Sequence, residues 1–458
     1  MLRQAQQPLT TKSKKMKTLF NICICVLLSS GGWAQQELTA NDAVLIALQN
    51  NYDVQVADLQ KVIRETNNTW GEAGAFPSVD IVIGQNNSIQ DNRNNPFTFT
   101  PGVILSQSVA PSVNVNYNIF TGFAVRMSKV RLEQLEEQSS NNATAVMETA
   151  IQDVLKAYYT AQLHNARTEM LREVYNISKD RVTYYELKQE YSTGTSLELM
   201  QFRNQMLTDS SNLILQELSY KNSVRNLLLL MNDTLMSPES LELTDPLDIG
   251  EVLIDQDAAI ASMLENNQNL KNQYINIELQ KTNTALQKSF LYPTLSLQVG
   301  ANPSWNRFEE IQDGLLSAQT QNLVYYGNLS LRYSLFNNWK NKRAVEVSQI
   351  QEEIAEISTK SMEVTLTNTL LNLLELYEVR NRLVAISEQN LEYAKKSFEL
   401  AEDRFARGTI NSIDLATIQS NYRNTLIQHY ENIYNRMDTY LEIYRMTGQI
   451  SLEYQTSE

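Results

Sequence analysis

The sequence has few of the residues that interrupt or cross-link a chain. Its 458 residues include 14 glycines and 9 prolines, so long uninterrupted elements are expected. The only cysteines, Cys23 and Cys25, lie in an apolar run near the start that is expected to be removed. The mature chain is therefore predicted to have no disulfide, no thiolate metal ligand and no cysteine for a lipid anchor.

Residues and motifs for catalysis are also scarce. The only two histidines, His164 and His429, lie in long helical patterns and far apart in sequence. No Walker loop, nucleophile elbow, HExxH zinc motif or dinucleotide fingerprint occurs. Isolated histidines of this kind are far more often packed or solvated helix residues than catalysts. We therefore predict that the protein is not an enzyme and needs no cofactor or metal.

Positive charge is in the minority, with 38 Lys and Arg against 52 Asp and Glu and a net charge of −14. Such a surface makes nucleic acid a poor partner. The apolar run Leu19–Leu28 is too short to span a bilayer. It follows a lysine cluster and precedes small residues, which is the layout of a secretory signal peptide, assigned here to residues 1–34. Both Met1 and Met16 are consistent with its start.

The chain contains an internal duplication. The segment 117–123 (YNIFTGF) recurs 216 positions later as 333–339 (YSLFNNW), and Asn50-Asn51 falls on Asn266-Asn267 at the same offset. A shared offset at several points indicates structural repeats. We predict a first repeat at 35–232, a linker or equatorial region at 233–256, a second repeat at 257–448 and a C-terminal tail at 449–458.

Each repeat contains two stretches in which apolar and polar residues alternate. In the first stretch, for example, Val79, Ile81 and Ile83 lie on one face and Ser78, Asp80 and Gly84 on the other, which is typical of a strand with one apolar face and one polar face. The segments 86–110 and 301–324 lack this period and are predicted to be loops. The predicted strands lie at about 78–85, 112–120, 294–301 and 327–336, and the predicted strand–helix junctions lie at Pro77, Phe120, Pro293 and Phe336.

Helical patterns fill most of the rest. A first helix is predicted from Thr39 to about Glu72. Long helices without proline or glycine are predicted at 123–191 and 339–407, where apolar residues recur every seven positions and favour coiled-coil packing. Each long helix ends at a Gly-Thr pair, Gly194-Thr195 or Gly408-Thr409, which suits a tight reversal. The predicted return helices span 197–232 and 411–447.

Four strands with one apolar face have the length of membrane-spanning strands but cannot close a barrel alone. Open edges in lipid leave backbone groups unpaired, at several kcal/mol each. We therefore expect copies of the chain to assemble. Two copies would give eight strands, whose interior side chains fill, whereas three would give twelve strands around a lumen. The alternative is an ordinary sandwich face on a soluble secreted protein.

The chain resembles the outer membrane efflux proteins of the TolC type over its whole mature length. The resemblance rests on the duplicated helix–hairpin–long helix unit, the Tyr-x-x-Phe at the strand ends and the duplicated Gly-Thr reversals. The resemblance implies a mixed α/β-barrel fold: a homotrimer with a 12-stranded transmembrane β-barrel in the outer membrane on a long α-helical coiled-coil periplasmic tunnel. It also implies an exit channel of a tripartite efflux or type I secretion system. The implied partners are an inner-membrane transporter, a periplasmic adaptor (membrane fusion) protein and outer membrane lipid.

The same resemblance implies roles for residues at the two reversals, the expected periplasmic tips. Asp414 matches an acidic position that rings the aperture in the family, and Glu198 is its counterpart in the first repeat. Phe405 lies where the family often has an aromatic gate residue. Both carboxylates can instead stabilise the start of the return helix. The alternative function is a periplasmic coiled-coil adaptor or structural protein without a membrane pore.

Overall fold

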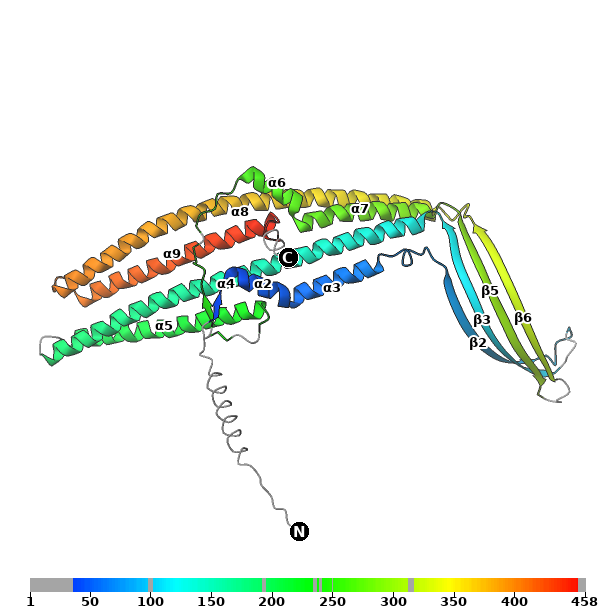
Figure 1. The fold of residues 1–458 in the computed structure, drawn as a ribbon, viewed down its shortest axis with the longest axis horizontal. Coiled ribbons are helices and arrows are strands. Elements are labelled where there is room, and N and C mark those ends of the chain that lie inside the picture. The colour runs from blue at the N-terminus through cyan, green and yellow to red at the C-terminus, as the bar shows by residue number, and fades with distance from the viewer. Residues whose placement is uncertain are drawn as a thin grey trace, which may run out of the picture.

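The computed structural model describes residues 36–97, 102–191, 195–233, 237–238, 241–248, 250–311 and 317–451. The signal peptide assigned to residues 1–34 lies outside these residues, as does the end of the C-terminal tail, 452–458. The molecule is elongated, with helices along most of its length and a four-stranded sheet at one end (Figure 1). None of the described helices is long and apolar enough to cross a membrane.

The first repeat begins with two helices, α2 (Ala40–Asn50) and α3 (Tyr52–Asn67). The prediction of one helix from Thr39 to Glu72 is therefore wrong. The backbone of Asn51 is extended, and its side chain accepts hydrogen bonds from the N–H groups of Asp53 and Val54, so this residue ends α2 and caps α3.

The second repeat begins in the same way, with α6 (Gln256–Asn266) and α7 (Gln268–Ser289) on either side of the capping residue Asn267. Asn51 Nδ2 also donates to the carbonyl of Leu230, and Asn267 Nδ2 donates to that of Met446. The same asparagine in each repeat thus caps one helix and binds the end of the return helix.

The long helices are α4 (Ala124–Glu190) and α8 (Lys340–Ala406), and the return helices are α5 (Ser196–Leu230) and α9 (Ser412–Met446). These bounds lie within two residues of the predicted ones. The seven-residue seams face inward, since Val154, Ala161, Tyr377, Val384 and Phe398 are buried.

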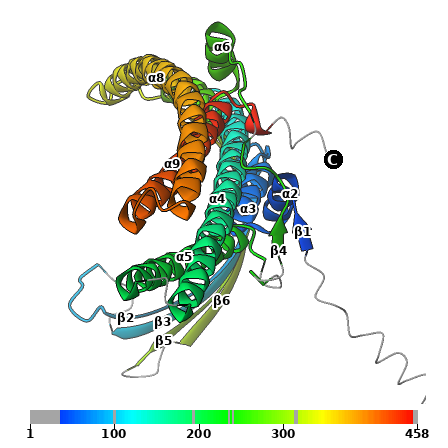
Figure 2. The ribbon, with the colours of Figure 1, turned by 90° about the vertical axis from the view of Figure 1, so that its left-hand side faces the viewer.

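These helices form a single curved row. At the end away from the sheet, α4 packs against α5 on one side and α9 on the other, and α9 packs against α8 (Figure 2). At the end near the sheet, α4 lies between α3 and α7, and α7 packs against α8. One edge of the row is therefore formed by α3 and α5, and the other edge is formed by α8 along its whole length.

The strands β2 (Ser78–Asp91), β3 (Val103–Thr121), β5 (Thr294–Glu310) and β6 (Ser317–Arg332) form an antiparallel sheet in the order β2-β3-β5-β6. All four are longer than predicted. The predicted loops 86–110 and 301–324 are wrong, because most of their residues belong to these strands. The last strand also ends at Arg332 rather than at 336.

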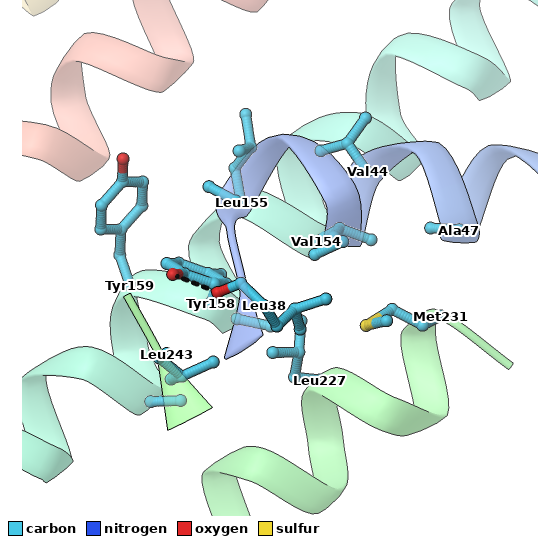
Figure 3. Close-up of a cluster of buried hydrophobic side chains, with 14 of the residues drawn as sticks. Leu38, Val44, Ala47, Val154, Leu155, Tyr158, Tyr159, Leu227, Met231 and Leu243 are labelled. Atoms are coloured by element: carbon cyan, nitrogen blue, oxygen red, sulfur yellow. Dashed lines mark hydrogen bonds between the residues drawn. The ribbon is translucent and has the colours of Figure 1, made fainter. Parts of the chain in front are cut away.

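The main core lies at the waist of the helical part, where the linker folds back on the chain. The linker contributes β4 (Leu241–Leu243), which pairs in parallel with β1 (Gln36–Leu38). The buried hydroxyl of Tyr158 donates to the carbonyl of Leu38 at 2.9 Å (Figure 3). The same hydroxyl accepts from the N–H of Asp245 at 3.0 Å. Burial raises the pKa of Tyr158 to about 12. The predicted linker is therefore anchored to the first long helix.

Candidate functional site

The sheet has one apolar face that is exposed to the surroundings. Register pairs Val79 with Val115 and Leu297 with Leu329, so apolar side chains of adjacent strands lie side by side on this face. Ile83 and Leu331 are 73% and 70% exposed. Contiguous exposed apolar surface of this kind marks a membrane or protein contact.

The apolar face has a defined height. On β5 the outward positions are apolar or small from Leu295 to Trp305 and then change to Arg307 and Glu309. Ten residues at about 3.4 Å each, tilted by about 40°, give a band roughly 25 Å tall, which is the height of the apolar band of outer membrane barrels. Beyond the band most side chains are polar, and the apolar ones, such as Ile89, Leu105 and Phe308, do not alternate regularly with them. The apolar alternation is absent there, which explains why the sequence predicted loops.

The opposite face is lined by amides and hydroxyls. Tyr326 lies across Gly300, and its hydroxyl hydrogen-bonds to the Asn114 side chain on β3. A Cβ atom on Gly300 would lie 2.6 Å from the Tyr326 hydroxyl and 2.6 Å from the carbonyl oxygen of Val113. Only glycine leaves room for this tyrosine to cross the strand. No sequence pattern predicted this contact.

The predicted junction residues lie where the strands meet the helices. Pro77 and Pro293 each stand one residue before a strand. The register shifts between Asn118 and Phe120, and this bulge places Phe120 opposite Leu295 on the apolar face. Phe336 lies beyond the end of β6.

Two consecutive residues with positive φ connect each of the strands β3 and β6 to its long helix. Gly122 and Phe123 have φ of 64° and 72°, and Asn338 and Trp339, at the same positions of the second repeat, have φ of 58° and 60°. A Cβ on Gly122 would lie 2.3 Å from the carbonyl oxygen of Ser289, so glycine is required there. The two repeats therefore enter their long helices through the same backbone conformation.

The two helix reversals lie at the end of the molecule opposite the sheet (Figure 1). Gly194 is outside the described residues. Thr195 and Glu198 form a reciprocal capping box at the start of α5. In the second repeat Gly408 has φ of 73°, and the N–H of Thr409 donates to the carbonyl of Arg404, which closes α8.

The two tip carboxylates thus both sit in the first turn of a return helix. Glu198 accepts from the Thr195 backbone, and Asp414 follows the cap Asn411, whose side chain accepts from the Asp414 N–H at 2.8 Å. The helix-stabilising role considered from the sequence is compatible with both positions. Asp414 is exposed and Glu198 is half-buried, so both retain some access to ions.

Phe405 lies in an aromatic cluster that joins the two helical hairpins. Its ring centroid is 5.9 Å from that of Tyr185 on α4 and 5.7 Å from that of Phe202 on α5. Arg181 lies over the Phe202 ring and forms an ion pair with Glu402 at 3.2 Å. Burial lowers the pKa of Arg181, and the nearby Glu402 opposes this shift. In this chain Phe405 therefore contributes to packing between the hairpins.

A buried polar network lies next to this cluster, and the sequence did not indicate it. The Asp209 side chain on α5 is fully buried and accepts from Ser178 Oγ at 2.6 Å and from Gln205 Nε2 at 3.0 Å. Arg423 on α9 completes the network, with Nη1 3.4 Å from Asp209 Oδ1. The carboxylate therefore ties the return helix of one hairpin to the other hairpin.

The two histidines lie in separate places. His164 Nδ1 is 3.0 Å from Gln216 Nε2, and His429 Nδ1 is 3.0 Å from Ser387 Oγ. Burial lowers the pKa of both imidazoles. Among the residues the structure describes, no group of three or more His, Cys, Asp or Glu side chains is arranged to hold a metal ion.

Comparison with known proteins adds to this geometry. The family model described as outer membrane efflux protein matches residues 44–233 and 259–449, one segment in each repeat. No curated protein matches the chain. The fold is similar to that of the CmeC outer membrane channel of Campylobacter jejuni, with a TM-score of 0.72 at 15% identity over 91% of this chain and 88% of that one.

Two further solved structures have comparable similarity. CusC, whose structures concern transmembrane channel formation, has a TM-score of 0.70 at 14% identity over 89% of this chain and 92% of that one. The open state of the MtrE outer membrane channel of Neisseria gonorrhoeae has a TM-score of 0.67 at 15% identity over 89% and 88%. The similarity to these structures covers both the helical part and the sheet.

Proposed function

Because this chain belongs to the outer membrane efflux protein family, as its sequence resemblance predicted, we propose that it is the trimeric exit channel of a tripartite efflux or type I secretion system. The family places the chain in the outer membrane as an efflux channel, with its helices as a periplasmic tunnel. The number of copies, the partners and the export direction are the proposed parts.

The observation that carries the proposal is a matched pair of apolar stripes on the two edges of the helical row. On α5, Met200, Leu207 and Ile214 recur every seven residues, and each is at least 60% exposed. On α8, Leu400, Tyr393 and Ile386 do the same in the opposite chain direction. Exposed stripes with this spacing call for a partner helix.

The two stripes have the same register. Met200 lies near the tip at the start of α5, and Leu400 lies near the tip at the end of α8. Seven residues farther from the tip, α5 has Leu207 and α8 has Tyr393. After seven more residues, α5 has Ile214 and α8 has Ile386. Antiparallel helices pair in this manner, so α5 of one copy fits α8 of the next.

The end near the sheet repeats the arrangement. An exposed apolar stripe on α3 consists of Tyr52, Val56, Leu59 and Ile63. A second stripe, on the part of α8 nearest the sheet, consists of Val347, Ile350, Ile354, Ile357 and Val364. The strands β2 and β6 are the edges of the described sheet and can pair between copies. A head-to-tail contact of this type closes a ring, and three copies give twelve strands.

The test uses cysteine pairs, because both natural cysteines lie in the assigned signal peptide. Leu207→Cys with Tyr393→Cys should form disulfide-linked dimers and trimers under mild oxidation, since these positions face each other across the contact. Leu207→Cys with Ile386→Cys is the matched control, displaced by one heptad or about 10 Å along the helix. Equal cross-linking of the two pairs, or linked species larger than trimers, would contradict the proposed register.

The tip is the proposed contact with the periplasmic adaptor and the inner-membrane transporter. Glu198 and Asp414, repeated in three copies, would place acidic side chains around the closed end. Multivalent cations should therefore block the conductance of single channels in planar bilayers, and Asp414→Ala should weaken the block. A channel insensitive to such cations, or a block that survives Asp414→Ala, contradicts this role.

The alternative of a periplasmic adaptor without a pore has less support. It leaves the apolar face of the sheet, with side chains such as Ile83 and Leu331, without anything to cover it. Membrane fractionation together with heat-modifiable migration of an oligomer distinguishes the two functions.

A further inference from the structure

A pair of aromatic side chains followed by a cation occurs at the same place in both repeats, where the sheet meets the long helices. In the first repeat it is Phe120, Phe123 and Arg126, and in the second it is Phe336, Trp339 and Lys342. The ring centroids lie 5.2 Å apart for Phe120 and Phe123, and 5.8 Å apart for Phe336 and Trp339, edge to face in both cases.

These triplets continue the apolar face of the sheet. The bulge in β3 places Phe120 opposite Leu295 on that face, and Phe123 packs against Phe120. Arg126 lies in the first turn of α4, three residues after the N-cap Phe123. The Lys342 ammonium lies over the Trp339 ring, 5.6 Å from its centroid. The cations therefore lie at the edge of the apolar band that is nearest the helices.

The charge of this region is opposite to that of the whole protein. The chain carries a net charge of −14, yet every charged residue in 122–132, 279–293 and 333–345 is basic. Glu133, Glu278 and Glu346 adjoin these segments, and the first two pair with Lys129 and Lys281. Within the described part of the chain, no carboxylate lies within 4.0 Å of Arg126, Lys342 or Arg343. All three are exposed. Among the described residues, none forms an ion pair with any of these three cations.

We infer that these two triplets, with the neighbouring Lys340 and Arg343, bind the headgroups of anionic phospholipids in the membrane leaflet that faces the helices. Aromatic side chains favour the level of the headgroups, and an anionic membrane surface attracts nearby Lys and Arg side chains. Here the aromatic side chains and the cations both lie directly on the helix side of an apolar band of membrane height. The inference depends on the membrane placement of the sheet and not on the number of copies or the partners.

The test exploits the tryptophans of the mature protein, from which the assigned signal peptide 1–34 with Trp33 has been removed, in bilayers that contain phosphatidylcholine and phosphatidylglycerol. A variant with W70F and W305F keeps Trp339 as a reporter beside Lys342, and a variant with W70F and W339F keeps Trp305 at the opposite rim of the band. Quenching by brominated phosphatidylglycerol is compared with quenching by brominated phosphatidylcholine. The Trp339 reporter should show preferential binding of phosphatidylglycerol, and the Trp305 reporter should show much less.

In the Trp339 reporter, Lys342→Gln should lower the preference about fivefold, which corresponds to about 1 kcal/mol for one cation at a membrane surface. Arg343→Gln should lower it further. Arg382→Gln is the control: it removes a 76% exposed cation from the same helix, roughly 60 Å from the junction, and should leave the preference unchanged.

Equal quenching by the two lipids, the same preference at both reporters, or a preference that persists in Lys342→Gln/Arg343→Gln overturns the inference. Oligomer migration and channel conductance are measured on the same samples. A protein that prefers phosphatidylglycerol but forms no channel would contradict the proposed function and leave the lipid site standing.

Discussion

Replacing Arg423 with methionine should weaken the contact between the two helical hairpins more than any surface change. Asp209 is fully buried, and its hydrogen-bond donors Ser178 and Gln205 belong to the same hairpin as itself. Arg423 is the cation that compensates this carboxylate from the other hairpin, at 3.4 Å. Methionine fills a similar volume but leaves the carboxylate without its counter-charge.

The size of the effect follows from burial. Removing one partner of a buried ion pair typically costs about 3 to 5 kcal/mol, because the remaining charge is uncompensated. Replacing both partners with neutral side chains removes this penalty. The double variant Asp209→Asn/Arg423→Met should therefore recover most of the stability that Arg423→Met loses.

Hydrogen exchange of the detergent-solubilised protein measures this locally. Amides of α5 and α9 near these residues should exchange about a hundredfold faster or more in Arg423→Met, because about 3 kcal/mol corresponds to a factor of more than 100. The waist core around Tyr158 should keep its protection. Unchanged exchange in Arg423→Met, or a double variant no better protected than the single one, would refute the reasoning.

Three further predictions concern stability. Gly122→Ala should reduce the yield of folded oligomer, measured by heat-modifiable migration, because the new Cβ would meet the Ser289 carbonyl. Gly408→Ala, which has open space around it, should lower the free energy of unfolding by only about 1 to 2 kcal/mol. Burial lowers the pKa of His429 in the folded protein, so the unfolded chain takes up a proton at a higher pH than the folded chain does. Stability should therefore fall as pH drops below about 6.5. His429→Gln should make stability, measured in urea titrations, less dependent on pH. Burial raises the pKa of Glu148, which therefore costs stability at neutral pH, so Glu148→Gln should raise the thermal midpoint at pH 7.5 and not at pH 4.

The large-scale organisation could be predicted from the sequence because it depends on periodic patterns. The 216-residue offset predicted two equivalent halves, and Asn51 and Asn267 indeed cap equivalent helices. The family resemblance and the fold class of a helical tunnel joined to barrel strands are confirmed by the family match and the similar structures, whereas the trimer stays a prediction. Long helices were easy to place because nothing interrupts them before Gly408 or its counterpart.

The strand ends and the contacts between hairpins could not be predicted in this way. Beyond Trp305 the strands leave the apolar band, and backbone hydrogen bonds hold them without any apolar alternation to reveal it. The Asp209–Arg423 pair joins residues 214 positions apart on polar-looking helix faces. No local pattern distinguishes such a buried pair from solvated charges.

The left-handed connection between strand and long helix also bears on how the two halves diverged. Thr-Gly-Phe in one half and Asn-Asn-Trp in the other share little as letters, yet φ is 64° and 72° in the first and 58° and 60° in the second. Asparagine tolerates this conformation, so the second half adopts these angles without a glycine, whereas the Ser289 carbonyl restricts the first half to glycine. The backbone angles of the two halves are thus more alike than the residues that adopt them.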